Sequence, residues 1–593
     1  AAQSVGEAPT SVAVDADGAW VTVSSTDELL RLDPSTAAVI GRFALAASPQ
    51  AVALDEGRAI VATTPAAGSH RGGTLRVLTS PDGLPESPDP TYNGDFSIPS
   101  QTNDALVTYK RVGGPDGLTI VPDLAADIPQ PRDDGRTWTF RLRSGLTYST
   151  GAPVRASDVL RSFERAVLAS NDRTASAGDF QNREIVGSAA CSATPPCNLS
   201  RGISADDAAG TVTFHLTTGD ANFDNAIWAA PILPAGTPLT KSDTPLPATG
   251  PYVVASFQAG HEERLVRNPQ FHEWSSDAQP DGNPDEIDFT IPDAADPTTE
   301  VESGAADVLL VESASAARLA QLRTQVPGQL HIAPSSETWF EMMNTTIPPF
   351  DDINVRKAVS LATDRAAVVD AWGGPLTGQV ACQVLPPEFA GYVRYCPWTS
   401  DASPNGNWIG RDLPRAQALI AAAGVRGDSV TVWGLDDQGQ HAAIARYFTG
   451  LLDELGFKAT THLLSLDAYF GFLQDTPNKA QMAGYWVIAP DRSPAEEIIG
   501  SFACPSFPGY VFGYPAGWCD STLDTKMKAT VDLEATDPIG ANQQWARIDQ
   551  ALVDAAPAVM AFNPTALSML SARVGGYQDH PLLHVMYDQL WVR

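Results

Sequence analysis

Strands and helices follow one another without a fixed period over about 520 residues, from Gly73 to the last residue. Clean alternation of apolar and polar residues predicts strands in the runs TVTFHLTT, YVVASFQ, EIDFTIP and SVTVWGL. Apolar residues at helical spacing predict helices over 355–372, 413–424 and 441–456, and the last two end in glycine. A stretch of this length exceeds what one hydrophobic core fills, so the sequence predicts an α/β protein with two lobes.

Residues 1–72 follow a different pattern. The run PTSVAVDADGAWVTVSS begins at Pro9 and the similar run PQAVALDEGRAIVATT begins at Pro49, 40 residues later. Two further alternating strands surround the Asp33-Pro34 turn between them. Short strands at such a period are typical of β-propeller blades, and the segment resembles the repeats of secreted bacterial propellers of the seven-bladed lactonase-like kind. Two copies do not close a ring of four to eight blades, so we interpret the segment as a short all-β propeller-like fragment.

The charge of the chain excludes some classes of partner. Its net charge is −32, from 38 basic and 70 acidic residues, which argues against nucleic acid or an anionic membrane surface. No apolar run is long enough to span a bilayer, and the first residues lack the basic start and apolar core of a signal peptide. We expect a mature extracellular, cell-surface or periplasmic chain, tethered to a membrane in the full-length protein.

Six cysteines occur as sequence-local pairs, none of them in a CxxC motif. An even number in local pairs favours disulfides and an oxidising compartment, although six reduced structural cysteines are the alternative. The nine histidines do not cluster beside the cysteines, so no zinc site is predicted. The predicted disulfides are Cys191 with Cys197, Cys382 with Cys396, and Cys504 with Cys519.

Catalytic motifs are absent from the sequence. It contains no GxSxG elbow, no Walker-type glycine loop and no HExxH. The run DGNPDEIDF starts like a calcium loop, but Glu286 replaces its glycine and Pro292 its final glutamate. We therefore predict no catalytic residue, no metal and no cofactor, and a binding protein rather than an enzyme. A secreted hydrolase with an acid pair is the enzymatic alternative, and it predicts turnover of a bound ligand.

Aromatic side chains in loop-like contexts are the candidates for ligand binding. Aromatic bodies with polar tips suit a concave ligand pocket, and they equally suit core anchors of disulfide-tied loops. One group stands at the end of an apolar run, a second before an asparagine, and a third within the last cysteine pair. We predict that Trp486, Tyr485 and Trp339 supply aromatic stacking surfaces and that Asn344 supplies a hydrogen-bonding amide. Asp491 supplies a negative counter-charge, and Phe512 is an aromatic residue of the ligand-binding loop.

The run from 121 to 167 carries the most specific pattern. It has a P-x-L-A turn at Pro122, a D-G hairpin at Asp134, a strand ending F-x-L-R at Phe140 and a helix start A-x-D-V at Ala156. These motifs resemble the signature of the family 5 extracellular solute-binding proteins, the peptide- and nickel-type receptors of ABC importers. Further blocks in the same order extend the resemblance over 73–593, among them GPY at Gly250, RNP at Arg267, SGAAD at Ser303 and the run that starts with NTT at Asn344.

The resemblance implies a two-lobed periplasmic-binding-protein-like fold whose first lobe carries an inserted subdomain. It implies a monomeric extracellular receptor that closes its lobes on a peptide or other polar small molecule and delivers it to an ABC permease. Two departures stand out. Arg155 replaces the threonine that usually caps the A-x-D-V helix, and Pro490 stands where peptide-binding members have the acidic residue that holds the peptide amino terminus. Asp491 follows one position later.

The predicted organisation has six segments. They are a propeller-like fragment over 1–72, lobe I over 73–98, its inserted subdomain over 99–204, lobe I again over 205–308, lobe II over 309–545 and a return to lobe I over 546–593.

The alternative function is that of a ligand-sensing domain in a larger membrane-anchored signalling protein with propeller blades. Its partner in the membrane would then be a signalling protein.

Overall fold

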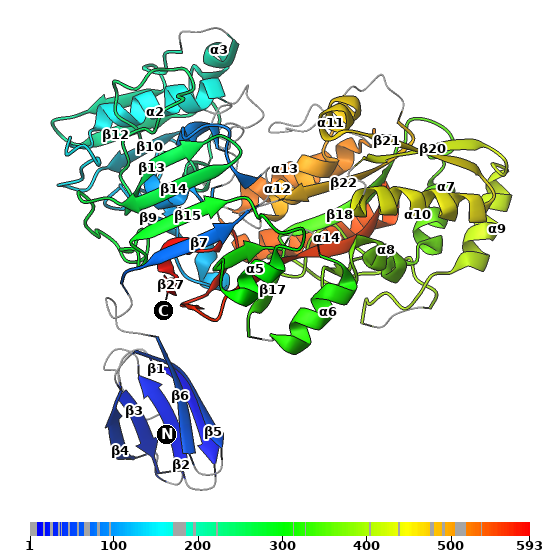
Figure 1. Ribbon diagram of the computed structural model, residues 1–593. Helices are drawn as coiled ribbons and strands as arrows, with labels where there is room; N and C mark the ends of the chain where they lie inside the picture. The colour runs from blue at the N-terminus through cyan, green and yellow to red at the C-terminus, as the bar shows by residue number, and fades with distance from the viewer. Residues whose placement is uncertain are drawn as a thin grey trace.

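The computed structural model of the chain covers two lobes and an N-terminal β unit (Figure 1). No helix in the described ranges is long and apolar enough to cross a membrane. The structure describes residues 9–592 except 16–17, 24–27, 34–35, 37, 46–47, 56–57, 65–70, 80–82, 94–95, 170–184, 194–196, 221–222, 312–313, 327, 402–404, 437–438, 475–479, 489–492, 505–516 and 535.

One twelve-stranded mixed sheet runs through both lobes (Figure 1). Its order is β13-β14-β15-β7-β16-β23-β18-β22-β20-β21, and β17 and β19 pair with β23 beside this path. The strands are β7 (Thr74–Leu78), β13 (Tyr252–Gln258), β14 (Glu262–Arg267), β15 (Glu286–Thr290), β16 (Val308–Leu310), β17 (Leu330–Pro334), β18 (Glu337–Met343), β19 (Gly378–Val380), β20 (Ser429–Leu435), β21 (Lys458–Leu464), β22 (Met482–Ile488) and β23 (Ala558–Leu570).

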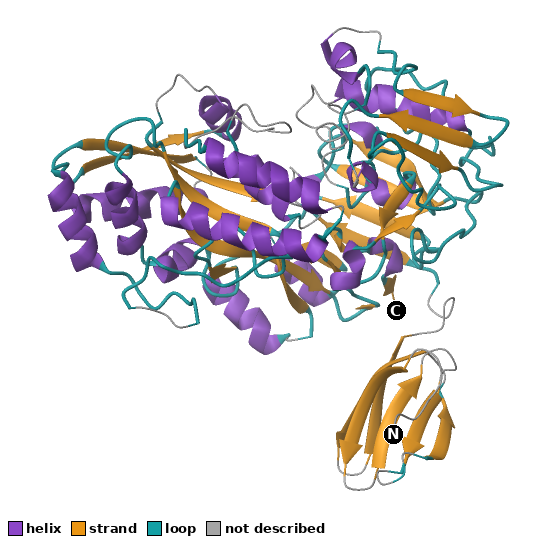
Figure 2. Ribbon diagram, turned by 180° about the vertical axis from the view of Figure 1, so that it is seen from behind, coloured by secondary structure: helices purple, strands orange, loops and turns teal. Residues whose placement is uncertain are grey.

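Lobe II has three layers, with helices on both faces of the sheet. Successive residues of β18 point to opposite faces and so contact different helices. Trp339 and Met343 pack under one group of helices, whereas Phe340 and Met342 pack under another. Figure 2 shows helices on both sides of these strands. The first group comprises α7 (Ile353–Ala362), α8 (Arg365–Trp372), α9 (Leu413–Ala423) and α10 (Gln440–Leu455). The second comprises α11 (Leu466–Gln474), α12 (Pro494–Phe502), α13 (Ser521–Glu534) and α14 (Pro538–Ala555).

Lobe I is built around β7, whose Leu75 and Val77 are fully buried. Its second core cluster joins Leu78 to the helices that precede β16 and β17. The C-terminal residues return to this lobe, because Tyr587 and Leu590 pack in the β7 cluster. The smaller elements of lobe I are α1 (Pro99–Thr102), α5 (Thr298–Ser303), α6 (Ala316–Gln325), β24 (Val574–Gly575), β25 (Asp579–His580), β26 (His584–Val585) and β27 (Trp591–Val592).

The inserted subdomain confirms the predicted strand and helix of the family-like run. Trp138 and Phe140 of the predicted strand are buried together with Phe163 of the helix. The subdomain contains β8 (Val107–Tyr109), β9 (Ile120–Pro122), β10 (Thr137–Arg141), α2 (Ala156–Ala169), α3 (Ser188–Ala193), β11 (Ile203–Asp206), β12 (Thr211–His215) and α4 (Phe223–Ala226). Its main sheet has the order β10-β12-β11.

Two carboxylates compensate for the missing threonine cap of α2. The Asp158 carboxylate accepts a hydrogen bond from the Arg155 N–H at 2.8 Å. Asp207, which follows β11, accepts from the Ser157 N–H at 2.7 Å and from the Ser157 hydroxyl at 2.9 Å. The Arg155 N–H and the Ser157 N–H of the first helical turn are therefore satisfied without a capping side chain at Arg155.

Two of the three helix predictions hold and one is wrong. The helices predicted over 413–424 and 441–456 are α9 and α10, each ended by a left-handed glycine, Gly424 (φ 73°) and Gly456 (φ 98°). The helix predicted over 355–372 is two helices, α7 and α8. Thr363 between them is extended, and the Asp364 side chain accepts from the Ala367 N–H at 3.2 Å, so a new helix starts there.

The structure places three segment boundaries differently from the prediction. Core residues of the inserted subdomain continue to Ile232, so a boundary at 204 would cut through β11 and separate β12 from its sheet. The chain enters lobe II at Ser335–Ser336 rather than at 309, because α6 and β17 pack in lobe I. It returns within β23 rather than at 546, because α14 packs against lobe II.

The N-terminal unit contains the predicted strands. Strands β1 (Pro9–Asp15), β2 (Gly18–Val23), β3 (Glu28–Leu32) and β4 (Val39–Ala44) form an antiparallel sheet in that order. The hairpin of β5 (Ser48–Asp55) and β6 (Arg58–Thr64) contacts β1 through a hydrogen bond from the Val52 N–H to the Ser11 hydroxyl, at 3.2 Å. The alternating pattern is confirmed as strands, and its assignment to a propeller stays a prediction.

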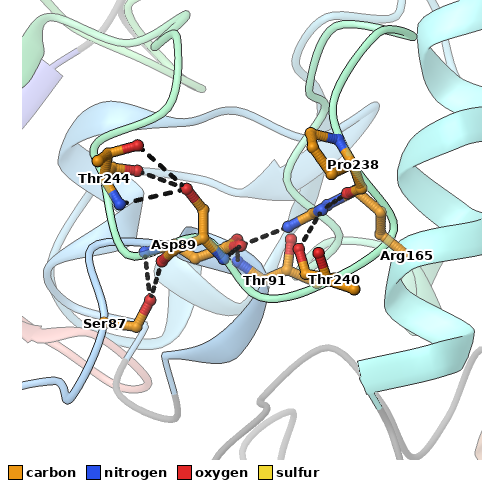
Figure 3. A network of polar contacts seen from close by, with 8 residues as sticks. Ser87, Asp89, Thr91, Arg165, Pro238, Thr240 and Thr244 are labelled. Atoms are coloured by element: carbon orange, nitrogen blue, oxygen red, sulfur yellow. Dashed lines mark hydrogen bonds and ion pairs between the residues drawn. The ribbon is translucent and has the colours of Figure 1, made fainter.

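A buried ion pair ties the inserted subdomain to lobe I (Figure 3). Arg165 of α2 and Asp89, which precedes the short 3₁₀ helix Pro90–Tyr92, have fully buried side chains and are bonded to each other. Arg165 also donates to the carbonyl oxygens of Pro238 and of Thr240, the latter at 3.1 Å. The Asp89 carboxylate accepts in addition from the Ser242 N–H at 2.9 Å. Two loops and one helix therefore meet at this pair.

We expect Arg165→Met to destabilise the chain by about 3–5 kcal/mol, because the change leaves the Asp89 carboxylate buried without its cation. Chemical denaturation measures this free energy of unfolding. The matched control is Arg141→Ala, which removes an exposed pair with Asp127 and should change stability by less than about 1 kcal/mol. Equal losses in the two variants would contradict the structural role of the buried pair.

Candidate functional site

Within the described residues, two segments connect the lobes. Strand β17 pairs with residues Thr565–Met569 of β23 in lobe I, and β18 pairs with Ala558–Phe562 of the same strand in lobe II. Ser335–Ser336 joins β17 to β18, and Asn563–Thr565 is the corresponding part of β23. The two crossings lie side by side, because the Ser335 N–H donates to the Pro564 carbonyl oxygen at 3.1 Å.

Side chains take over part of the hydrogen bonding at the crossing. Pro564 has no N–H group to give to a neighbouring strand. The Asn563 amide instead donates to the Glu337 carbonyl oxygen at 3.0 Å and to the Thr338 hydroxyl at 2.8 Å. The Thr565 N–H donates to the Thr377 carbonyl oxygen at 3.0 Å. The pairing of β23 with β17 and β18 therefore has a gap at Asn563–Pro564, while β19 stays paired with both residues.

The direction of β22 decides which predicted site residues lie near this crossing. Strand β22 is antiparallel to β18, with Glu337 opposite Ile488 and Met343 opposite Met482. The last residue of β22 is therefore beside the first residue of β18, at the crossing. Asp491 follows β22 within 489–492 and lies outside the described residues, as does Phe512 within 505–516.

Tyr485 and Trp486 belong to the crossing half of β22, where their backbones pair with Phe340 and Trp339. Trp339 itself is 3% exposed and packs in the lobe II core. Its ring centroid lies 5.9 Å from that of Phe562 in a stacked arrangement and 5.5 Å from that of Trp372. Trp339 therefore packs in the core of lobe II, and its contact with a ligand stays a prediction.

Asn344 lies at the other end of the same strands. Its N–H donates to the Gln481 carbonyl oxygen at 2.8 Å, and its side-chain oxygen accepts from the Thr346 hydroxyl at 2.6 Å. Six residue steps of β18 separate this end from Glu337, about 20 Å at the usual rise of a strand. The structure therefore does not bring Asn344 together with the strand end that precedes Asp491.

All three predicted disulfides are present. Cys191–Cys197 lies in the inserted subdomain, and Cys382–Cys396 and Cys504–Cys519 lie in lobe II. The last of these links the end of α12 to the segment before α13 and closes the loop that contains Phe512.

Two buried carboxyl groups near the crossing escaped the sequence analysis. Glu337 begins β18, and burial raises its pKa to about 7. Glu497 lies on α12, directly after 489–492, is 0% exposed, and neither carboxyl oxygen has a hydrogen-bond partner among the described residues. Burial, with the charges of Glu337 and Asp549, raises the pKa of Glu497 well above its usual range. Within the described residues, neither Glu337 nor Glu497 forms an ion pair with a Lys or Arg side chain.

The sequence contains one signal for Glu497. Pro494, Ile498 and Phe502 recur at the spacing of one helix face, and Glu497 falls on that same face. A glutamate at a position that the helical period assigns to the core is costly unless it is paired, so such a residue is a candidate for function. No cluster of three or more His, Cys, Asp or Glu in the described part of the chain is arranged to hold a metal ion.

We expect Glu337→Gln to reduce the pH dependence of stability between about pH 4.5 and 7. Over this window the folded protein keeps a proton on Glu337 that the unfolded chain has already released, so stability falls as the pH rises. The slope removed by the substitution is at most about 1.4 kcal/mol per pH unit. Denaturation at a series of pH values measures it. The exposed control Asp127→Asn should keep the original profile, and an unchanged profile in Glu337→Gln would contradict the assignment.

Comparisons with known proteins agree with this architecture. A dipeptide-binding protein of Pseudomonas aeruginosa is 25% identical over 549 residues, covering 86% of this chain and 94% of that protein. The solved structure of the clavulanic acid biosynthesis oligopeptide binding protein 2 has a TM-score of 0.75 at 23% identity, covering 88% of this chain and 96% of that one. A periplasmic binding protein of Helicobacter pylori, DppA in complex with the peptide STSA, has a TM-score of 0.67 at 18% identity, covering 88% and 98%.

These structural likenesses confirm the predicted two-lobed α/β fold. The profile described as bacterial extracellular solute-binding proteins, family 5 Middle, matches residues 119–495, more than half of the chain. The chain therefore belongs to the family 5 bacterial extracellular solute-binding proteins.

Proposed function

We propose that the chain is an extracellular receptor that captures a peptide, or a similar polar small molecule, between its two lobes for delivery to an ABC importer. The observation that carries the proposal is the pair of adjacent crossing segments in a member of this family. The two short crossing segments give the lobes a place to rotate, and closure on a ligand requires tighter binding to the closed form. The receptor acts as a monomer, without catalysis, and is tethered to a membrane in the full-length protein.

The crossing end of lobe II is the proposed ligand site. Tyr485 and Trp486 supply aromatic surfaces, Asp491 supplies the counter-charge for a ligand ammonium group, and the loop with Phe512 forms part of the rim. The buried carboxyl group of Glu497 lies directly after the segment that contains Asp491. The peptide class is supported by the relatives, which are named as binding dipeptides or oligopeptides and one of which is solved with a peptide.

A second candidate function rests on the N-terminal β unit. Its six strands lie outside the family match, which begins at residue 119. If this unit is part of a propeller, the two lobes serve as the ligand-sensing domain of a larger membrane-anchored signalling protein. The gene sequence upstream distinguishes the two: a lipidation cysteine after a leader supports transport, and a membrane span with a cytoplasmic regulatory domain supports sensing.

We expect peptides of two to eight residues to raise the thermal unfolding temperature of the purified chain, because a ligand that binds only the folded state stabilises it by mass action. At a free concentration one hundred times the Kd the gain is about 2.7 kcal/mol. A thermal-shift screen with sugars and metal chelates beside the peptides tests this, with native mass spectrometry as the independent readout. A shift with another class and none with peptides would reject the peptide assignment.

We expect Asp491→Asn to weaken binding of a peptide with a free amino terminus by about tenfold or more, since a charge-assisted hydrogen bond is lost. The N-acetylated form of the same peptide lacks the ammonium group and should bind the variant and the original chain equally. Isothermal titration calorimetry measures both. The matched control is Asp206→Asn, an exposed aspartate of β11 in the inserted subdomain. Equal losses for both peptide forms would show that Asp491 does not read the amino terminus.

A further inference from the structure

A cavity lies between the inserted subdomain and the rest of lobe I. It has a volume of about 40 Å³ and is partly open to solvent. One water needs about 10–15 Å³, so the cavity has room for a group of a few heavy atoms. Its polar walls come from segments far apart in the sequence, namely Asp104 and Arg111 on either side of β8, Asp123 after β9, and Gln279.

One oxygen of Asp104 and one of Gln279 have no donor among the described residues, while side-chain hydrogen bonds with Thr249 and Gln279 partly offset the effect of burial on the pKa of Asp104. Asp104 is 4% exposed and Gln279 is 2% exposed. Neither the Oδ2 atom of Asp104 nor the Oε1 atom of Gln279 has a hydrogen-bond partner among the described residues. The Gln279 Nε2 group donates to the Ser100 carbonyl oxygen at 2.9 Å, which holds the amide in place. Because a buried acceptor without a donor is costly, the cavity is built for a molecule that brings N–H or O–H groups.

The charges around the cavity are not balanced. Arg111 is the guanidinium in its wall, and its Nη2 atom lies 2.9 Å from the Oδ1 atom of the buried Asp588. Asp104 and Asp123 are two further carboxyl groups beside it. Lys110 next to Arg111 is directed to Asp277, at 3.4 Å. Arg111 is thus paired with Asp588, and within the described residues the Asp104 and Asp123 carboxyl groups form no ion pair of their own.

The titration of these groups is consistent with a missing cation. Burial raises the pKa of Asp104 to about 7. Burial, followed by the charge of Asp104, raises the pKa of Asp123 well above its usual range. Both carboxyl groups would be stabilised as carboxylates by a positive charge in the cavity.

Three aromatic rings complete the wall. The ring centroid of Trp228 lies 4.6 Å from that of Phe96 and 5.2 Å from that of Tyr109, and all three residues line the cavity. Aromatic faces attract cations, most strongly where water is excluded. Rings beside unpaired carboxyl oxygens suit an organic cation better than a neutral molecule.

We propose that this cavity binds a small primary ammonium compound of about the size of methylammonium, whose N–H groups donate to the side-chain oxygens of Asp104 and Gln279 and whose carbon contacts Trp228. The site lies in lobe I, in residues separate from the proposed peptide site at the end of β22. It is therefore independent of the proposed function, and either can fail without the other.

The test adds methylammonium chloride to the full chain and measures thermal unfolding, with sodium chloride and potassium chloride at the same ionic strength. We expect a saturable stabilisation by methylammonium alone. Asp104→Asn should weaken it at least tenfold. The matched control is Asp549→Asn in lobe II, because Asp549 is also a buried carboxyl whose pKa burial raises to about 7. The control variant should respond as the original chain does.

Two further variants keep the proposal testable if Asp104→Asn does not fold. Gln279→Leu removes the second acceptor, and Trp228→Leu removes one ring, so each should weaken the response to methylammonium by about tenfold. The proposal would be overturned if sodium or potassium chloride raised the unfolding temperature as much as methylammonium chloride does. It would also be overturned if the folded cavity variants kept the full response to methylammonium. A cooperative thermal unfolding transition of each variant without methylammonium serves as the readout of folding.

Discussion

The whole molecule depends on the backbone pairing of β23. This strand of 13 residues is almost entirely buried, and it pairs with β16 and β17 in lobe I and with β18 and β19 in lobe II. Both lobes therefore share one sheet, and their relative position is fixed by hydrogen bonds along one segment. The pairs with β17 end at Thr565 and those with β18 begin at Phe562, so only β19 pairs with Asn563 and Pro564 between them.

The local spacing of apolar and polar residues predicted the helices and strands well where one face of the element is buried. The runs YVVASFQ and SVTVWGL match β13 and β20 in full, and in β20 the alternation follows the burial of Val430 and Val432 between more exposed neighbours. The pattern over 355–372 failed because apolar spacing continues through a helix boundary. The capping carboxylate of Asp364 sets that boundary, and a single side-chain hydrogen bond is invisible to periodicity. Segment boundaries failed for a related reason, since packing and not pattern decides which lobe α14 joins.

The candidate site was harder to predict because it depends on register. Trp339 and Asn344 are five positions apart in one run, yet antiparallel pairing places only the first in the half of the sheet nearest the crossing. Trp339 in addition lies on the face of β18 that α7 to α10 cover, where an aromatic side chain fills the core. The buried acids Glu337 and Glu497 come together only through the contact of β18 with α12 and α14, which no local motif encodes.

The route of the chain through the two lobes also bears on how the protein folds. Lobe II is continuous from β18 to the first half of β23, whereas lobe I is completed only by the second half of β23 and the residues after it. Contacts such as Val308 with Leu570 join residues 262 positions apart (570 − 308), and long-range pairing of this kind is slow to form. During synthesis the edges of β16 and β17 that pair with β23 stay unpaired until the second half of β23 arrives, and unpaired strand edges favour aggregation.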